Sequence, residues 1–318
     1  MNDEIIKRLI PVTAEEKRIL EGCGNIDREI YMHDGSDMIN AKKLLEKGKI
    51  ITLRAHTRFV HFPEHTHDFV EVIYMCSGKT THIINGEKIV LNCGELLFLG
   101  RNAVQEILPA GKNDIAVNFI ILPAFFDRVL DMLGNEETPL KSFVADSLKG
   151  EDGNGVYLHF KVADVLPVQN LVENLVWSLL YDEENSKSIN SVTMGLLFLQ
   201  LLNLTDRLEY RNKKEQNLMY IFRYIEEHYC DGELKELADI LHYDFSWLSR
   251  EIKQRTGKTY TELIQDKRLS KAAFFLRSTS VKVSEIAVRT GYANISYFHR
   301  IFKKKYGVSP AQYRKQKG

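Results

Sequence analysis

The chain has 318 residues, of which 44% are hydrophobic and 27% are charged, values that are ordinary for a soluble globular protein. Its four cysteines are scattered and form no CxxC pair, which suits a reducing compartment better than secretion. The N-terminus lacks an apolar leader, and the most apolar stretch, residues 195–204, is far shorter than the ~20 residues that span a bilayer. The sequence therefore predicts an intracellular protein with no membrane partner.

Residues 1–49 are predicted to form an N-terminal arm, and residues 50–125 a domain of short strands. Residues 70–75 are rich in strand-forming types, and residues 80–84 and 88–91 flank Asn85-Gly86, a strong hairpin signal. A further turn at residues 92–94 precedes an apolar run at residues 96–99. Many short strands with frequent turns indicate a β-barrel or a double-sheet jelly roll.

One group of polar residues in this segment is chemically distinctive. His65, His67 and Glu71 share the parity of a strand, so we expect them to face one way. Two imidazoles and a carboxylate on one wall suit a divalent metal or a polar ligand. The spacing resembles the first motif of the cupin superfamily. The second cupin motif implies one more histidine, and Gln105 occupies the position where it would be expected.

Three uses of this barrel remain open. In the first use, the barrel is a pocket for a small polar effector, such as a sugar. His65, His67, Glu71 and Gln105 would line this pocket, and Arg58 would be a further hydrogen-bond donor. Alternatively, His65, His67 and Glu71 hold a divalent metal in a cupin metalloenzyme, although a fourth ligand and an acid/base pair are missing, so no enzyme is expected. The third use is an interaction module without a ligand.

Residues 126–210 are predicted to form a helical connecting region. Apolar residues recur at 168, 171, 172, 175, 176 and 179, and again at 192, 196, 197, 199 and 208, with an acidic loop at residues 182–186. Two amphipathic helices need a surface that covers them, either the barrel or a second copy of the chain. The polar residues 211–216 are expected to be a linker.

The last part of the chain, residues 217–318, is basic and repeats itself. It contains 19 lysines and arginines against 11 acidic residues, a balance of +8 that is typical of a nucleic-acid-binding module. Residues 236–238 (ELA) recur as residues 285–287 (EIA), residues 246–250 recur as residues 296–300, and Gly257 recurs as Gly307. The offset is 49 or 50 residues throughout, so the segment contains two copies of one unit.

Each copy is predicted to be a helix-turn-helix, at about residues 234–255 and 283–306. Gly291 marks the turn of the second copy, and Asp244 and Asn294 suit the N-cap of each second helix. A helix over about residues 260–277, with a Thr259–Glu262 capping box, joins the copies. Its length of about 27 Å would hold two recognition helices roughly one DNA turn apart.

Residues 217–318 resemble the DNA-binding domain of the AraC/XylS family of transcription regulators. The resemblance rests on residues 286–292 (IAVRTGY), 296–303 (SYFHRIFK) and 307–310 (GVSP). It implies a helical domain with two recognition helices, attached to a cupin-like sensor. It also implies a bacterial cytoplasmic transcription regulator, more often an activator that works with RNA polymerase, which binds double-stranded DNA and forms a homodimer.

Recognition helices present the exposed residues of their first turns to DNA bases and phosphates. The arginines suit guanine, Ile295 suits a thymine methyl group, and the lysines suit phosphates, to which Lys304 and Lys305 also belong. The predicted DNA-binding residues are Ser246, Ser249, Arg250, Lys253, Ile295, Ser296, His299, Arg300 and Lys303.

Overall fold

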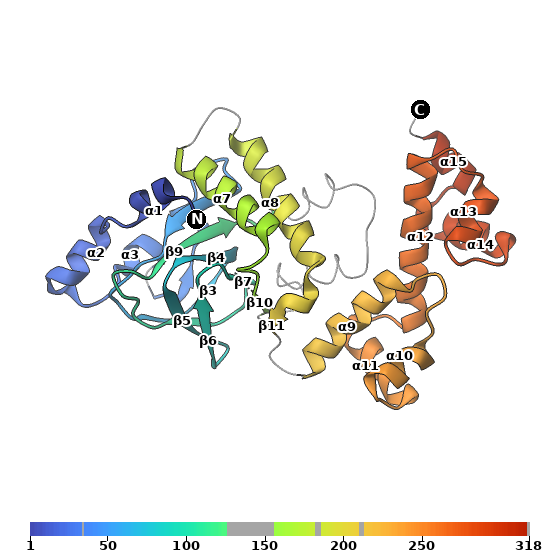
Figure 1. Ribbon diagram of the computed structural model, residues 1–318, viewed down its shortest axis with the longest axis horizontal. Coiled ribbons are helices and arrows are strands. Elements are labelled where there is room, and N and C mark those ends of the chain that lie inside the picture. The colour runs from blue at the N-terminus through green and yellow to red at the C-terminus, as the bar shows by residue number, and fades with distance from the viewer. Residues whose placement is uncertain (34, 126–155, 182–185, 210–212, 317–318) are drawn as a thin grey trace. The chain divides into compact units, whose positions relative to one another are not determined.

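A computed structural model describes residues 1–33, 35–125, 156–181, 186–209 and 213–316 of the chain (Figure 1). The chain divides into two compact units. The described residues up to 209 form the N-terminal unit, and residues 213–316 belong to the C-terminal unit. Within the described residues, no helix is both long and apolar enough to cross a membrane.

The N-terminal unit is built on two facing sheets. One has the strand order β1-β3-β8-β5-β6 and the other β11-β10-β7-β4-β9-β2. The strands are β1 (Met38–Ile39), β2 (Ile51–Ala55), β3 (Phe62–His67), β4 (Val70–Ser77), β5 (Lys79–Ile84), β6 (Glu87–Asn92), β7 (Leu96–Leu99), β8 (Gln105–Ile107), β9 (Ile115–Ile121), β10 (Tyr157–Phe160) and β11 (Leu208–Glu209). This double sheet confirms the predicted jelly-roll class.

Local chemistry explains the strand connections. β5 and β6 form a hairpin in which Ile84 and Glu87 are the last residue pair before the turn. The turn residues Asn85 and Gly86 both have positive φ, as a tight hairpin requires. β4 is buried along almost its whole length because it lies in the middle of its sheet and has neighbours on both faces. Ile73 and Met75 of β4 pack between the sheets, whereas Tyr74 points the other way and donates a hydrogen bond to Gln169 of the helix α7 (Leu166–Tyr181).

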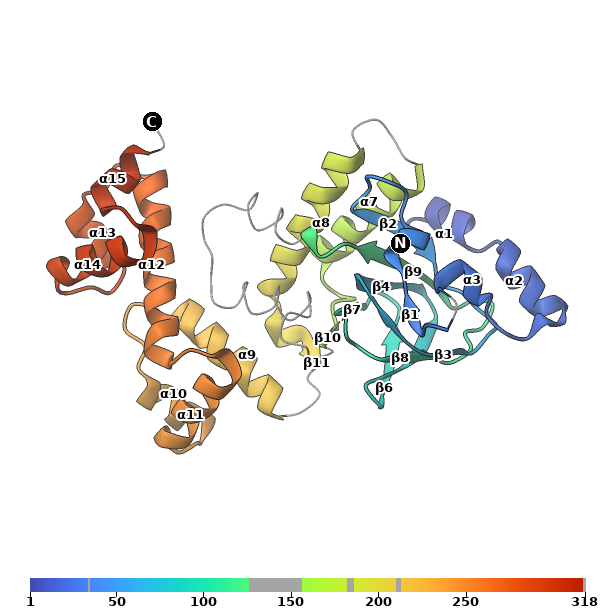
Figure 2. The same cartoon turned by 180° about the vertical axis from the view of Figure 1, so that it is seen from behind.

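Helices flank these sheets. The arm contains α1 (Asp3–Leu9), α2 (Ala14–Arg18), a π-turn (Ile19–Cys23), α3 (Arg28–Tyr31) and α4 (Ala41–Leu44). Its apolar residues, among them Ile19, Tyr31 and Ile39, share a core cluster with Phe62 and Phe69 of the barrel. After the barrel, α7 (Leu166–Tyr181) and α8 (Ser186–Leu202) lie side by side, and a 3-10 turn (Thr205–Arg207) leads to β11 (Figures 1 and 2).

Two boundaries differ from those predicted. β10 and β11 lie in the region expected to be helical, and β10 pairs with β7, so the barrel sheet extends beyond residue 125. β10 is short, but it includes the strand-forming residues Tyr157 and Phe160, a signal that the prediction overlooked. Residues 213–216 belong to a helix rather than to the linker. The predicted helical stretch at 126–155 and most of the acidic loop lie outside the described residues.

The C-terminal unit consists of seven helices between residues 213 and 315. They are α9 (Lys213–Glu227), α10 (Leu234–Leu241), α11 (Phe245–Thr256), α12 (Tyr260–Ser278), α13 (Val283–Arg289), α14 (Ile295–Tyr306) and α15 (Pro310–Lys315). The long α12 runs from the group of α9, α10 and α11 to the group of α13, α14 and α15 (Figures 1 and 2). The pairs α10–α11 and α13–α14 confirm the two predicted helix-turn-helix units.

The predicted caps are also present. Asp244 and Asn294 accept hydrogen bonds from the backbone of Trp247 and Tyr297, and Thr259 forms a complete capping box with Glu262. The second helix-turn-helix turns at Gly291, with a φ of +83°. The first turns at His242, a residue that also adopts a positive φ. Apolar residues of α12, α13 and α14, including Leu276, Ile286 and Phe302, form one core.

Candidate effector pocket and DNA-binding surface

The N-terminal unit contains an interior pocket between the sheets. Its polar lining comes from Tyr31, Arg54, His56, Thr57, His65, Glu71 and Asn118, and its apolar lining includes Ile39, Leu44, Phe62 and Phe69. The cavity measures about 40 Å³, on a scale on which one water molecule needs about 10–15 Å³. Tyr31, Ile39 and Leu44 belong to the arm, so the arm supplies part of the wall, a contribution that the sequence did not reveal.

His65, His67 and Glu71 meet in the interior, but not as predicted. β3 ends at His67 and β4 begins at Val70, and the chain crosses from one sheet to the other between them. The two histidines therefore face Glu71 across the interior instead of sharing one wall with it. His67 Nε2 lies 3.6 Å from Glu71 Oε2, and all three side chains are buried.

Gln105 lies beside His65, as the cupin-like spacing suggested, and satisfies its neighbours. One end of its side-chain amide is 3.1 Å from His65 Nε2 and the other end is 3.0 Å from His82 Nδ1. Because a neutral His65 donates from Nδ1 to the Pro63 carbonyl, its Nε2 accepts a hydrogen bond, and the amide nitrogen is the end of Gln105 that can donate it. His82 Nε2 is in turn 2.8 Å from the Thr80 hydroxyl. Because these groups bond one another, Gln105 and His82 are structural parts of the interior rather than pocket-lining groups.

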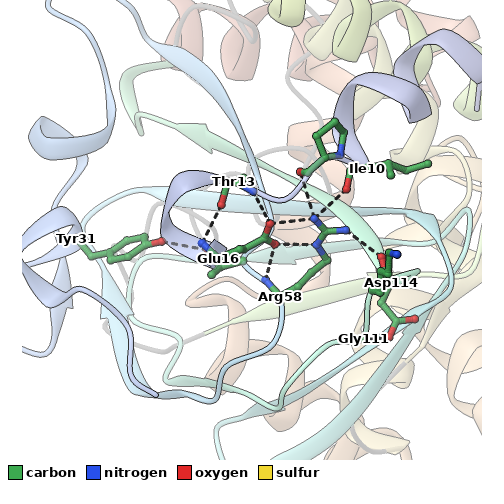
Figure 3. Close-up of polar contacts among 10 residues, drawn as sticks. Ile10, Thr13, Glu16, Tyr31, Arg58, Gly111 and Asp114 are labelled. Atoms are coloured by element: carbon green, nitrogen blue, oxygen red, sulfur yellow. Dashed lines mark hydrogen bonds and ion pairs between the residues drawn. The ribbon is translucent and has the colours of Figure 1, made fainter. Parts of the chain in front are cut away.

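Arg58 points away from the pocket. Its guanidinium bonds the carboxylate of Glu16 and the backbone carbonyls of Ile10, Pro11 and Lys112 (Figure 3). With its donors engaged in this buried network, Arg58 has no capacity left for an effector. The arginine that does line the pocket is Arg54, which lies over the ring of Tyr31, 5.0 Å from its centroid.

Two buried atoms of the pocket lack hydrogen-bond partners among the described residues. Asn118 donates to Glu71 Oε1 (2.8 Å), so its amide oxygen accepts from His56 Nδ1 (3.0 Å). A neutral His56 therefore has its proton on Nδ1, which leaves Nε2 as an unpartnered acceptor. The second atom is Glu71 Oε2. Such groups cost roughly 1–3 kcal/mol each when they stay unpaired, so they are natural points of contact for a ligand.

Burial controls the protonation of these groups. Desolvation lowers the pKa of His56, takes the pKa of His65 to about 4, and holds the pKa values of His67 and His82 well below 6.5. Desolvation also raises the pKa of Glu71 to about 7, against a hydrogen bond from Asn118 and the charge of Arg54, which lower it. The interior thus contains neutral imidazoles and one carboxyl group that titrates near neutrality.

The three predicted metal ligands are not arranged as a metal site, although both nitrogens of His67 and Glu71 Oε2 have no hydrogen-bond partner among the described residues. Within the part of the chain that the structure describes, no group of three histidine, cysteine or acidic residues is arranged to hold a metal ion. His65 Nδ1 lies 2.8 Å from the carbonyl of Pro63 and Nε2 contacts Gln105, so both of its nitrogens are already engaged.

The predicted DNA-binding residues lie on α11 and α14, and each is exposed or half-buried. Arg250 and Arg300 are both exposed, and the guanidinium of Arg300 lies 5.3 Å from the ring centroid of Tyr297. Lys305, in contrast, is paired with Asp266 at 2.7 Å. Trp247, on the same helix as Arg250, is half-buried and stacks on Tyr243.

The residues predicted from the sequence did not include Phe245. It is the first residue of α11, and 51% of its surface is exposed. The repeat offset of 50 makes it equivalent to Ile295, the first residue of α14, which is 40% exposed. That offset was the available signal, because an exposed apolar residue at equivalent places in both copies suggests a shared role.

A two-sheet domain with an interior pocket, joined in one chain to paired helix-turn-helix units, defines a DNA-binding protein with a ligand-binding domain. Two family models match accordingly: an AraC-like ligand binding domain over residues 47–202 and a helix-turn-helix domain over residues 237–316. The chain belongs to the AraC/XylS family of transcription regulators, which are not enzymes.

Curated relatives agree with this assignment. The chain is 27% identical to the HTH-type transcriptional activator RhaS of Enterobacter sp. (strain 638) and 26% identical to RhaS of Escherichia coli O1:K1 / APEC, in each case over 80% of this chain and 87% of the relative. Among solved structures, the C-terminal domain of AraT, a response regulator from Geobacillus stearothermophilus, is 37% identical over 33% of this chain and 88% of that domain, with a TM-score of 0.31.

Proposed function

We propose that this regulator activates transcription in the bacterial cytoplasm when a small neutral carbohydrate occupies the interior pocket. The observation that carries the proposal is the pair of unpartnered atoms, His56 Nε2 and Glu71 Oε2, in a pocket that is otherwise apolar or satisfied. The relatives named as transcriptional activators support the direction of regulation. Contact with RNA polymerase is part of the same proposal.

A hydroxyl group is the ligand chemistry that suits both atoms. His56 Nε2 accepts a hydrogen bond, whereas the carboxyl of Glu71, with a pKa of about 7, accepts when ionised and donates when protonated. A hydroxyl can donate to the first and either donate to or accept from the second. Arg54 disfavours a cationic ligand, and Glu71 disfavours an anionic one, so a neutral polyol is preferred.

The pocket must enlarge to take such a ligand. A volume of about 40 Å³ holds only a few water molecules, far less than a monosaccharide needs. Ligand binding therefore moves part of the wall. An effector can shift the balance between two arrangements of the protein only if it binds one of them more tightly.

On the DNA side, α11 and α14 are the proposed recognition helices. The residues proposed to contact bases or phosphates are Ser246, Ser249, Arg250, Lys253, Ile295, Ser296, His299, Arg300 and Lys303, together with Phe245. Support comes from their exposure and from their places in the first turns of both helices. The two helices would then enter successive major grooves.

A homodimer is the proposed assembly. Ile189, Val192 and Leu196 of α8 are 50%, 42% and 46% exposed, although they are apolar. With the half-buried Leu199 they recur at intervals of three and four residues, which is the seam of a two-helix coiled coil. A second copy of α8 packed on this seam would bury it.

Calorimetric titration of the full-length chain tests the ligand. We expect binding of at least one neutral monosaccharide, and no comparable binding of sugar acids or amines. Glu71→Leu should weaken that binding about tenfold or more, because it removes the carboxyl group that contacts the ligand while the side chain stays similar in size. The control is His61→Gln, which alters an exposed imidazole paired with Glu106. Tight binding of an anion would overturn the assignment, and no binding by any compound would favour the unliganded interaction module.

A further inference from the structure

The two helix-turn-helix units are held together by more than the continuous helix α12. Asp266, in the first half of that helix, contacts a residue on either side of it. Its Oδ2 lies 2.8 Å from Lys258 Nζ, in the loop between α11 and α12. Its Oδ1 lies 2.7 Å from Lys305 Nζ, on the second recognition helix. One carboxylate of α12 thus holds both the loop that leads out of α11 and the helix α14.

Arg268, half a turn further along α12, makes a second bridge. Its Nε and Nη2 donate to the carbonyls of Tyr229 and Cys230, 2.6 and 2.9 Å away, just beyond the end of α9. The same guanidinium lies over Tyr292, 5.6 Å from the ring centroid, in the turn of the second unit. Tyr292 is itself buried, so this contact is part of the second core.

The loop between α9 and α10 also touches the second helix-turn-helix unit directly. The Cys230 thiol donates to the carbonyl of Arg289, 3.1 Å away, and Gly291 lies against the same backbone. A Cβ atom on Gly291 would stand 2.6 Å from the Cys230 oxygen, which no side chain tolerates. The glycine is therefore required twice, by its positive φ and by this close approach.

We infer that Asp266 and Arg268 are positioning residues that fix the separation and angle of the two recognition helices, so that the domain accepts two half-sites at only one spacing. The inference rests on the proposed tandem reading of DNA by α11 and α14. Inserting one base pair moves a half-site by roughly 3.4 Å and turns it by about 34°. A bridged domain cannot follow that change with both helices, whereas a domain joined by α12 alone bends more easily.

The test uses the full-length chain and a DNA site selected from random sequence by the wild-type protein. Dissociation constants are measured for that site, for versions with one base pair inserted or deleted between the half-sites, and for each half-site alone. For the wild type we expect a spacing change to weaken binding at least tenfold. In Arg268→Ala and in Asp266→Asn, half-site binding should persist while the spacing penalty falls to about threefold or less. Arg289→Ala is the control, because it removes an arginine whose ion pair with Glu285 lies within one helix.

The other outcomes overturn the inference in distinguishable ways. Selection of a single uninterrupted motif would remove the tandem reading itself. Two motifs with the same spacing penalty in both variants as in the wild type would leave the tandem reading intact and refute the bridge. Loss of half-site binding in both variants would assign Asp266 and Arg268 to folding and not to spacing.

Discussion

Arg58 and Glu16 form a buried ion pair that ties the N-terminal arm to the barrel. Arg58 Nε lies 2.7 Å from Glu16 Oε1, and the side chains are only 3% and 1% exposed (Figure 3). Glu16 also closes the capping box of α2 with Thr13, so the helix cap aims its carboxylate at the guanidinium. Burial by itself would raise the pKa of Glu16, but hydrogen bonds from Arg58 and Thr13 outweigh it and lower that pKa.

Removing one partner of this pair should be costly. We expect Glu16→Ala to lower the free energy of unfolding of the N-terminal unit by about 3 kcal/mol, because it leaves a buried guanidinium without its counter-charge. Urea denaturation measures the change. Arg18→Ala breaks the exposed pair with Asp27 and should cost less than about 1 kcal/mol. Equal effects of the two substitutions would contradict the buried network.

The stability of the N-terminal unit should fall in mild acid. A histidine with a lowered pKa binds fewer protons when folded, so its contribution is complete above about pH 6.5 and is lost as the pH drops. For His65, with a pKa of about 4, the loss by pH 5 is roughly 2 kcal/mol. Glu71, with a pKa of about 7, acts in the opposite direction, since its neutral form is favoured in the folded state.

Three further buried histidines, His56, His67 and His82, also have lowered pKa values. The net effect of acid is therefore a lower free energy of unfolding. Urea unfolding at pH 7.5 and pH 5 measures the difference. Glu71→Gln should steepen the dependence, because it removes the one group that offsets the histidines. Higher stability at pH 5 than at pH 7.5 would show that these imidazoles are not buried in neutral form.

Regular features of the sequence predicted the C-terminal unit well. The repeat, the caps at Asp244 and Asn294 and the glycine turn are local signals, and each determines its own element. The pocket was less accessible, because it depends on which strand faces which. The shared parity of His65, His67 and Glu71 failed as an argument, since the chain changes sheets after His67. Arg58 was misjudged because its partner Glu16 lies 42 residues earlier in an arm with no strand signal.

Arg300 should discriminate between sequences. We expect Arg300→Ala to weaken binding to the selected site by ~1–3 kcal/mol and to leave binding to random DNA much less affected, because a guanidinium that reads a base contributes only where that base is present. Lys304→Ala is the comparison variant. It should weaken binding to both DNAs similarly and reduce the slope of log binding constant against log salt concentration by about 1. Equal loss on specific and random DNA would make Arg300 a phosphate contact.

Phe245 should read an apolar feature of the major groove. Its exposed ring begins α11, in the place that Ile295 holds on α14. We expect Phe245→Ala to relax the preference for thymine at one position of the first half-site, as measured by repeating the selection with the variant. Phe245→Leu should retain part of that preference. An unchanged motif would place Phe245 outside the interface.

The apolar seam of α8 should control assembly. Leu196→Glu introduces a charge at the centre of the seam and should convert the dimer to a monomer, as followed by sedimentation velocity. Lys187→Glu also changes charge on α8, at an exposed position away from the seam, and should leave the dimer intact. A wild-type chain that is monomeric at all concentrations would contradict the proposed role of the seam.

Regulation of DNA binding by a sugar is tested most directly by recovering genomic DNA fragments with the purified protein, with and without neutral monosaccharides, at one fixed salt concentration. We expect a small set of fragments that carry two motifs about one helical turn apart, and recovery that changes when the effective sugar is present. Recovery of unrelated fragments in both conditions, with strong dependence on salt and none on sugar, would contradict this expectation.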